Sequence, residues 1–210
     1  MMSVLLRPPP AALAVQKASL VTSALAVATV KGVLETMQIT LGIKWPNDLV
    51  VDNATDIPGD PGYRKVAGIL TETLIDDGSI SALVVGMGLN TSWGQVPPEL
   101  ELVATSLDLL TRSSVDRPSL ALKILQNFEN EYAHLLELTG SEKLLREVRH
   151  YSSTLGRRVR VHFDNSKETP TLEGHAVDLN DDGQLVVQTD RGDLQTVSVA
   201  DVEHLRLDAR

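Results

Sequence analysis

The amino-acid sequence predicts an α+β fold, in which a mixed β-sheet with flanking helices is followed by a small β-barrel. The first part of the chain alternates helix-forming stretches with apolar runs of strand length, and two such runs within residues 66–89 flank the tight-turn sequence Asp76-Asp77-Gly78-Ser79. After Leu155 the pattern changes to short alternating strands separated by polar turns, which is typical of a small barrel. We therefore expect one domain over residues 1–153 and a second over residues 154–210.

The N-terminal part is predicted to form a strand, a long helix and a second strand. Ser3 to Arg7 is short and apolar, and the proline triplet that follows it cannot continue a ladder of strand hydrogen bonds. Residues 11–37 are helix formers with a broad apolar face, and their many alanines suit a helix that packs closely against a sheet. Gly42 then restarts the chain as a strand that runs through Trp45.

Three further helices are predicted before the barrel. They begin near Leu107 with Thr105 or Ser106 as cap, near Pro118 with Ser114 or Asp116 as cap, and after Gly140 with Ser141 as cap. The apolar side of the second of these helices is formed by Leu120, Ile124, Phe128, Tyr132 and Leu135. We expect all three helices to support the fold rather than to carry chemistry.

The central stretch contains two apolar runs, 44–51 and 64–70, which are predicted to be neighbouring strands joined by a solvated loop over residues 52–63. Polar pairs stand at the mouths of both strands: Asn47 with Asp48, and Arg64 with Lys65. The ammonium of this lysine, with the small residues Ala67 and Gly68 just behind it, suits a flat ligand that lies against the backbone with its negative end on the amine. Considered alone, such a lysine is more typical of a solvated edge strand.

Three motifs follow one another along this part of the chain. They are Lys44-Trp45-Pro46-Asn47-Asp48, then Lys65-Val66-Ala67-Gly68-Ile69-Leu70-Thr71-Glu72, and then Val85-Gly86-Met87-Gly88-Leu89-Asn90. In this order they resemble the central motifs of the biotin protein ligases, and with all three present a purely structural role for the lysine is disfavoured. The resemblance implies the fold of that family, which is like that of class II aminoacyl-tRNA synthetases, and an SH3-like C-terminal domain for the tail.

The resemblance implies a two-step ligase reaction. Biotin and ATP, with Mg²⁺ accompanying the nucleotide, would give biotinyl-5'-adenylate and pyrophosphate. The biotinyl group would then pass to a lysine of the biotin carboxyl carrier domain of acetyl-CoA carboxylase or a related carboxylase. Both steps develop negative charge between a carboxylate, a phosphate and a leaving group, so placement and charge stabilisation are the main tasks of such an enzyme.

The resemblance also assigns site residues in this sequence. The catalytic residues would be Lys65 and Asp48, the biotin-binding residues Lys65, Ala67, Gly68 and Leu70, and the nucleotide-binding residues Asn47, Asp48 and Asn90. Lys65 would hold the biotin carboxylate and the acyl-phosphate oxygen, whereas Asp48 would orient the incoming lysine or a magnesium ion bound to ATP. No residues are assigned to a resident metal site.

The resemblance begins at Ser3 and corresponds to the back part of the ligase catalytic domain. Upstream of the strand that matches Ser3 to Arg7, these ligases carry a Ser/Thr-rich turn that contacts biotin and an Arg-Gly-rich loop over the adenylate, and we expect this N-terminal part to be lacking. One alternative is therefore a non-catalytic remnant that binds biotin, adenylate or the carrier domain without turnover. Another is a lipoyl or octanoyl transferase, which shares the expected fold but is matched less closely by residues 44–48.

Composition argues against several other classes of protein. The net charge of −9 and the pI near 5.0 disfavour a binder of nucleic-acid phosphates, which needs a concentrated basic face. The sequence has no cysteine for disulfides or thiolate chemistry, and its five histidines lack metal-ligand spacing. The longest uncharged run, residues 18–30, is too short to span a bilayer. We expect a cytoplasmic protein with no membrane partner, and the oligomeric state stays open, with a homodimer as one option.

Overall fold

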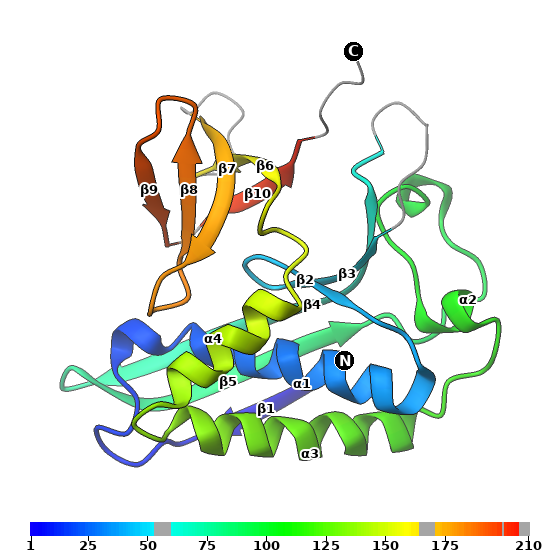
Figure 1. Cartoon of the computed structure of the whole chain (residues 1–210). Helices are drawn as coiled ribbons and strands as arrows, with labels where there is room; N and C mark the ends of the chain where they lie inside the picture. The colour runs from blue at the N-terminus through cyan, green and yellow to red at the C-terminus, as the bar shows by residue number, and fades with distance from the viewer. Residues whose placement is uncertain (53–59, 164–170, 199, 206–210) are drawn as a thin grey trace.

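The computed structural model describes residues 1–52, 60–163, 171–198 and 200–205, and these form two five-stranded sheets with helices (Figure 1). The first sheet has the strand order β1-β5-β4-β3-β2. Its strands are β1 (Met2–Leu6), β2 (Gly42–Lys44), β3 (Asp48–Asp52), β4 (Tyr63–Asp76) and β5 (Ser79–Leu89). The predicted α+β class is confirmed, while residues 53–59 of the predicted solvated loop lie outside the described part.

The first sheet is antiparallel, not mixed as the sequence suggested. All of its neighbouring strands pair antiparallel, and in the described residues parallel pairing is limited to two isolated bridges, Ile43 with Ser152 and Lys65 with Ala104. The reason is the short connections between consecutive strands from β2 to β5, because parallel strands need a long crossover.

The hairpin between β4 and β5 was predicted correctly. Asp76 pairs with Ser79, so the loop contains two residues. Asp77 has a φ of 46° and Gly78 a φ of 73°, and two positive φ values in a two-residue loop match the twist of the flanking strands. This hairpin fixes the register of the two strands that later form the floor of the site.

Helices cover one face of the first sheet (Figure 1). The helix α1 (Leu20–Met37) packs on the sheet, and both α3 (Arg117–Leu135) and α4 (Gly140–His150) pack on α1. The predicted helix over residues 11–37 begins later than expected, since Ala11 has a φ of 61°, which no right-handed helix includes. Only a short 3-10 turn, η1 (Val15–Lys17), precedes α1.

The small residues of α1 allow close packing on both of its sides. Ala24, Ala26 and Ala28 are buried, and a Cβ added at Gly32 would lie 2.8 Å from Cγ1 of Ile124 on α3. Within the described residues, Val15–Met37 has the length and hydropathy of a membrane span, but 61% of its most apolar window is buried inside the molecule. This burial fits the central helix of a folded core.

The cap predicted for α4 is wrong. Thr139 occupies the N-cap position, whereas Ser141 lies in the first turn, where its hydroxyl accepts a hydrogen bond from Lys17 Nζ at 3.2 Å. The tight turn after α3 explains the difference, because it presses Gly140 against the carbonyl of His134, where an added Cβ would collide. The helix therefore begins at this glycine.

The other two predicted helix starts are confirmed. Asp116 caps α3, and its side chain accepts a hydrogen bond from the backbone N–H of Ser119. The short helix α2 (Leu107–Thr111) follows Ser106, although this hydroxyl bonds to Asp108 rather than to the backbone.

The second sheet has the strand order β10-β6-β7-β8-β9 and lies beside the β2 edge of the first (Figure 1). Its strands are β6 (Arg158–His162), β7 (Thr171–Leu179), β8 (Leu185–Thr189), β9 (Leu194–Val197) and β10 (Asp201–His204). Trp45 connects the two sheets, because its backbone N–H donates to Thr154 Oγ1 and its Nε1 donates to the Gly183 carbonyl, both at 3.0 Å. The side chain of Trp45 thus belongs to the core and also links the two sheets.

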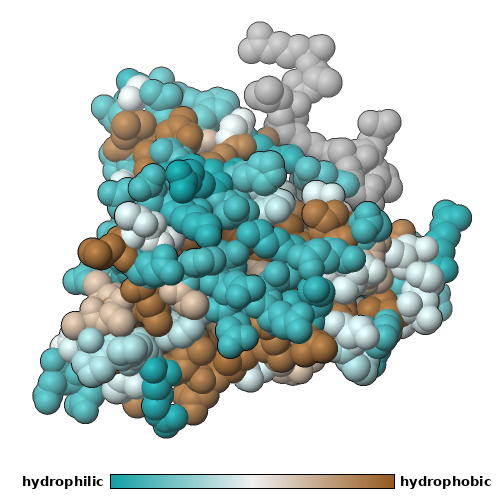
Figure 2. Space-filling view, turned by 60° about the horizontal axis from the view of Figure 1, so that its bottom comes forward, coloured by the Kyte–Doolittle hydropathy of each residue, from teal (hydrophilic) through white to brown (hydrophobic). Residues whose placement is uncertain are grey.

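The surface on the α3 side mixes polar and apolar residues. Figure 2 shows a hydrophilic band across the middle of this view with apolar side chains reaching the surface beside it. On α3 itself, Leu122 is 60% exposed and Leu125 is 39% exposed. Such single exposed leucines are common on folded proteins and do not mark a site.

Candidate active site

The face of the first sheet opposite α1 is open and carries the predicted site. Leu70, on β4, is 66% exposed on this face, whereas its neighbour Ile69 is buried. Leu70 pairs with Gly86 on β5, and Gly86 pairs with Ser3 on β1. In the next row Gly68 pairs with Gly88. Because side chains alternate between faces, these rows place three glycines at the middle of one open surface.

The missing side chains of these glycines leave a hollow in the sheet. It has a volume of about 390 Å³, and its lining includes Gly68, Leu70, Gly86, Gly88 and Asn47. A Cβ added at Gly88 would meet nothing within 4 Å, and one at Gly86 would meet only Ser3 Oγ at 3.4 Å and a backbone oxygen at 3.8 Å. A flat ligand could therefore lie directly against the backbone here.

A β-bulge brings Lys65 to the same face as this hollow. Leu49 pairs with Ala67, but Val50 pairs with Lys65, so Val66 is an extra residue on β4. One extra residue reverses the alternation of side chains, and Lys65 therefore points to the side of Gly68 although the two are three residues apart. The contact is close, because a Cβ added at Gly68 would lie 3.0 Å from Lys65 Nζ.

The ammonium of Lys65 is paired with a carboxylate. Its Nζ lies 2.6 Å from Oδ1 of Asp48, and the side chains of Lys65 and Asp48 are 44% and 20% exposed. Asp48 is the cross-strand partner of Gly68, so all three residues meet at one point. The lysine is neither a free edge-strand residue nor buried, and its amine stays within reach of a ligand that enters the open face.

The remaining predicted site residues do not all lie at the hollow. Asn47 lines the hollow, where its Nδ2 donates to the Ile69 carbonyl at 2.7 Å. Asn90 follows β5, and its Nδ2 donates to the Thr105 carbonyl at 3.1 Å. The structure does not bring Ala67 to the hollow: it is 1% exposed and belongs to the hydrophobic core, because alternation along β4 puts it on the helix-covered face together with Ile69.

Arg64, the neighbour of Lys65, has a structural role. Its guanidinium donates to Asp60 at 2.8 and 3.1 Å and to the Glu101 carbonyl at 3.0 Å. Both Arg64 and Asp60 are almost fully buried. The polar pair that the sequence placed at this strand mouth therefore separates into one residue for the fold and one for the site.

A second polar cluster lies where the two sheets meet. The Nζ of Lys44 lies 5.5 Å from the centre of the Tyr63 ring, and this ring packs edge-on against His204 at 5.2 Å. His204 Nε2 is 3.1 Å from Thr154 Oγ1. The sequence offered no metal-ligand spacing for His204, and only its place on β10 reveals this neighbourhood.

Burial controls the charges in this cluster. It lowers the pKa of Lys44 below the usual lysine value, against the opposing attraction of Asp48. Burial lowers the pKa of His204 to about 3, and the nearby charges of Lys44 and Arg157 add to that effect. Burial also raises the pKa of Tyr63 to about 12. His204 and Tyr63 are consequently neutral at neutral pH.

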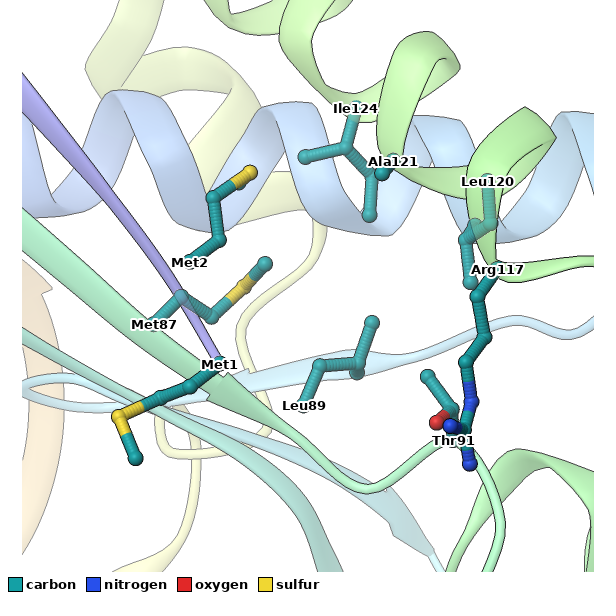
Figure 3. Close-up of a pocket in the computed structure, with 9 residues that line it drawn as sticks. All are labelled: Met1, Met2, Met87, Leu89, Thr91, Arg117, Leu120, Ala121 and Ile124. Atoms are coloured by element: carbon teal, nitrogen blue, oxygen red, sulfur yellow. The ribbon is translucent and has the colours of Figure 1, made fainter.

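Another hollow, of about 430 Å³, lies on the helix-covered side between the start of β1, the end of β5 and α3 (Figure 3). Met87 and Leu89 line it from β5, and Leu120 and Ile124 line it from α3. Arg117 extends beside Thr91 at its rim (Figure 3). None of the predicted site residues lines it, so we place the site on the open face.

Within the described ranges, no group of three or more His, Asp or Glu side chains has the geometry of a metal site. Asp48 is the carboxylate nearest to Lys65, and a single carboxylate does not make a dedicated cage for a cation. The open face is consequently suited to bind an anionic, partly apolar ligand through one ammonium and a backbone floor.

Two family profiles match this chain. The profile described as "Biotin/lipoate A/B protein ligase family" matches residues 1–90, and the one described as "Biotin protein ligase C terminal domain" matches residues 154–205. The chain belongs to the biotin protein ligase family. The first match contains all three predicted motifs, and the second covers the β6–β10 sheet.

Individual relatives in the biotin protein ligase family span most of this chain. The bifunctional ligase/repressor BirA of Bacillus subtilis is 31% identical over 205 residues, which make up 96% of this chain and 57% of that protein. The biotin–[acetyl-CoA-carboxylase] ligase of Mycobacterium tuberculosis is 32% identical over 79% of this chain and 53% of its own length. The chain thus spans little more than half the length of these relatives.

A solved biotin protein ligase shares the fold. The enzyme from Aquifex aeolicus superposes with a TM-score of 0.78 at 21% identity, covering 97% of this chain and 81% of that one. The same enzyme has been solved in complex with biotin and ATP, with a TM-score of 0.76 to this chain. At 21% identity, this structural similarity establishes the fold alone.

Sequence reasoning missed two residues that line the hollow. Gly86 and Gly88 were not assigned to the site, because a Gly-x-Gly alone is equally explained by a bulge or a turn. Their spacing of two was the available signal, since it puts both on one face of a strand. Their position opposite Gly68 and Leu70 depends on strand register.

Proposed function

We propose that this chain is a biotin protein ligase, which activates biotin with ATP to biotinyl-5'-AMP and transfers the biotinyl group to a lysine of a biotin carboxyl carrier domain. The observation that carries the proposal is the Lys65–Asp48 pair, 2.6 Å apart, at the edge of the glycine-lined hollow. Membership of the ligase family and the three motifs support the same reaction.

In the first step, Lys65 holds the carboxylate of biotin and stabilises the charge that builds on the acyl-phosphate oxygens. A lysine amine has three donor hydrogens, so it can keep its contact with Asp48 and still bind an incoming carboxylate. Gly68 and Leu70 offer the ring a mostly apolar floor. A preorganised donor of this kind contributes about 3 kcal/mol to stabilisation of a transition state.

Asn47, Asp48 and Asn90 are proposed to adjoin the nucleotide. ATP is expected because the Aquifex aeolicus ligase binds it together with biotin. Mg²⁺ would arrive with the ATP phosphates, and Asp48 is the carboxylate best placed to help orient it. In the second step the same carboxylate would orient the lysine of the carrier domain, which is the proposed protein partner.

We further propose the division into a catalytic domain, residues 1–153, and an SH3-like C-terminal domain, residues 154–210. A cytoplasmic location is also proposed, as expected from the sequence. The division has support from the match to residues 154–205 and from the separate β6–β10 sheet.

Transfer of labelled biotin to a purified carrier domain, with ATP and Mg²⁺, tests the proposal. Wild-type protein should label the carrier, and Lys65→Ala should lose at least about 10²-fold in rate. Lys123→Ala is the matched control, since this lysine pairs with Glu35 away from the site. Calorimetric binding of biotin without pyrophosphate release would instead favour a non-catalytic binder, and full activity of Lys65→Ala would refute the site.

A further inference from the structure

Lys44 is a buried cation without an acceptor. Its side chain is 4% exposed, and among the described residues no carboxylate or carbonyl oxygen accepts a hydrogen bond from its Nζ. The ring of Tyr63, 5.5 Å away, is its closest recorded polar contact. Keeping a charged amine largely out of water is less favourable than burying an apolar side chain of similar size. A contribution to stability therefore does not explain this residue.

The second sheet lies close to Lys44, since Asp201 and Glu203 on β10 act on its charge. β10 supplies His204, which packs on Tyr63 and bonds to Thr154. Thr154, in turn, accepts from the backbone N–H of Trp45, the residue next to Lys44. The Nδ1 of His204 is itself buried without a partner in the described part of the chain. A buried polar atom without a partner is rare in folded proteins, so the packing at this junction calls for an explanation.

Strand pairing also connects Lys44 to the candidate site. Lys44 pairs with Asp48 across β2 and β3, and Asp48 pairs with Gly68 across β3 and β4. Residues paired in this way project from the same face, so Lys44, Asp48 and Gly68 form one row. Asp48 consequently has an ammonium on each side: Lys65 in contact at 2.6 Å and Lys44 next to it in the row.

We propose that Lys44 is a positioning residue, through which docking of the β6–β10 sheet weakens the hold of Asp48 on Lys65 and frees the Lys65 amine for a ligand. The inference rests on the proposed function for the identity of that ligand, a carboxylate. Every other part of the inference concerns residues of this chain.

The physical basis is competition for one carboxylate. Removal of water from Lys44 by β10 lets its charge act on Asp48 through a low-dielectric medium, where the attraction is several times stronger than in water. Asp201 and Glu203 on β10 oppose this effect, and Arg157 adds to the positive charge at the junction. With Lys44 neutralised by substitution, Asp48 has only Lys65 to balance it and holds that amine more tightly.

Chemical labelling of Lys65 measures this directly, without any substrate. The full-length protein is pulsed with an acylating reagent, and the labelled fraction of Lys65 is followed by peptide mass spectrometry. Lys44→Met should slow labelling of Lys65 by roughly three- to ten-fold. Lys143→Met, which removes an exposed amine on α4, should leave it unchanged.

Two further variants separate positioning from a general disturbance. In an Asp48→Asn background, Lys44→Met should have no additional effect on the labelling rate, because the shared carboxylate charge is gone. Thr154→Val breaks the link from β10 to Trp45 and should also slow the labelling of Lys65. This slowing should be smaller in a protein that already carries Lys44→Met. Thermal unfolding of Lys44→Met should not fall below that of wild type, since a buried charge is lost.

Biotin affinity by calorimetry completes the test. Lys44→Met should weaken binding by about five- to ten-fold. If no variant binds biotin while the labelling effect persists, the proposed function fails and the positioning role stands. An unchanged labelling rate in Lys44→Met, or an equal decrease in the Asp48→Asn background, overturns the positioning role itself.

Discussion

Lys65 and Asp48 form an ion pair of 2.6 Å across β3 and β4 only because Val66 is an extra residue in β4. Without that bulge, strict alternation would put Lys65 on the face opposite Gly68. The bulge thus turns one lysine of an ordinary strand toward the open face, where the glycine floor lies. Irregularities of this kind are common beside active sites, where they re-aim a side chain.

Gly68→Ala should disturb this pair directly. The new Cβ would lie 3.0 Å from Lys65 Nζ and 3.4 Å from Asp48 Oδ1, so the ammonium must move. A displacement of about 1 Å at a reacting group can cost up to about 10²-fold in rate. We expect a loss of this order in biotin activation, measured as pyrophosphate release, with little change in thermal stability.

Gly88→Ala tests the floor of the hollow separately from the ion pair. Its Cβ would meet no atom within 4 Å, so the fold should accept it, but the methyl group would occupy ligand space in the hollow. We expect the KM for biotin to rise by about ten-fold or more, with a smaller effect on kcat. An unchanged KM would place the ring of biotin elsewhere.

His204 should make stability depend on pH in the acidic range. Its pKa is about 3 in the folded protein against 6.5 for the ordinary residue, so between these values the unfolded chain binds a proton that the folded chain does not. Stability from this residue is complete above pH 6.5 and is lost as the pH falls toward 3, by at most about 1.4 kcal/mol per pH unit.

Chemical denaturation between pH 7 and pH 4 measures this dependence. His204→Gln should flatten the part of the curve below pH 6.5, whereas His150→Gln, at an exposed position on α4, should not. The same slope in wild type and His204→Gln would contradict the assignment of a buried neutral histidine.

Trp45→Phe should weaken the connection between the two sheets. The change keeps an aromatic ring but removes the Nε1 donor, which leaves the Gly183 carbonyl without this 3.0 Å bond. The free energy of unfolding should fall by about 1 kcal/mol from the lost hydrogen bond. Limited proteolysis should also cleave the chain faster near residue 154, and identical rates in both proteins would argue against the bridge.

Local patterns in the sequence were sufficient for much of the fold. The hairpin at Asp77 and Gly78 depends on residues that tolerate positive φ, and the alanine-rich α1 on small side chains that allow close packing, so both could be predicted. The start of α1 and the cap of α4 could not, because the backbone at Ala11 and the contact of Gly140 with His134 are set by the turns around them.

The sequence by itself also predicted that Lys65, Asp48, Asn47 and Leu70 belong to one site, since the short motifs that contain them follow one another along the chain. Tertiary structure alone decided which faces they share. It turned Lys65 to the open face through a single extra residue, while Ala67 stayed in the core, and it brought His204 onto Tyr63 from more than a hundred residues away. The physical reason is that motif order is a property of the chain, whereas the face of a strand and the burial of a charge depend on register and on the neighbour that excludes water.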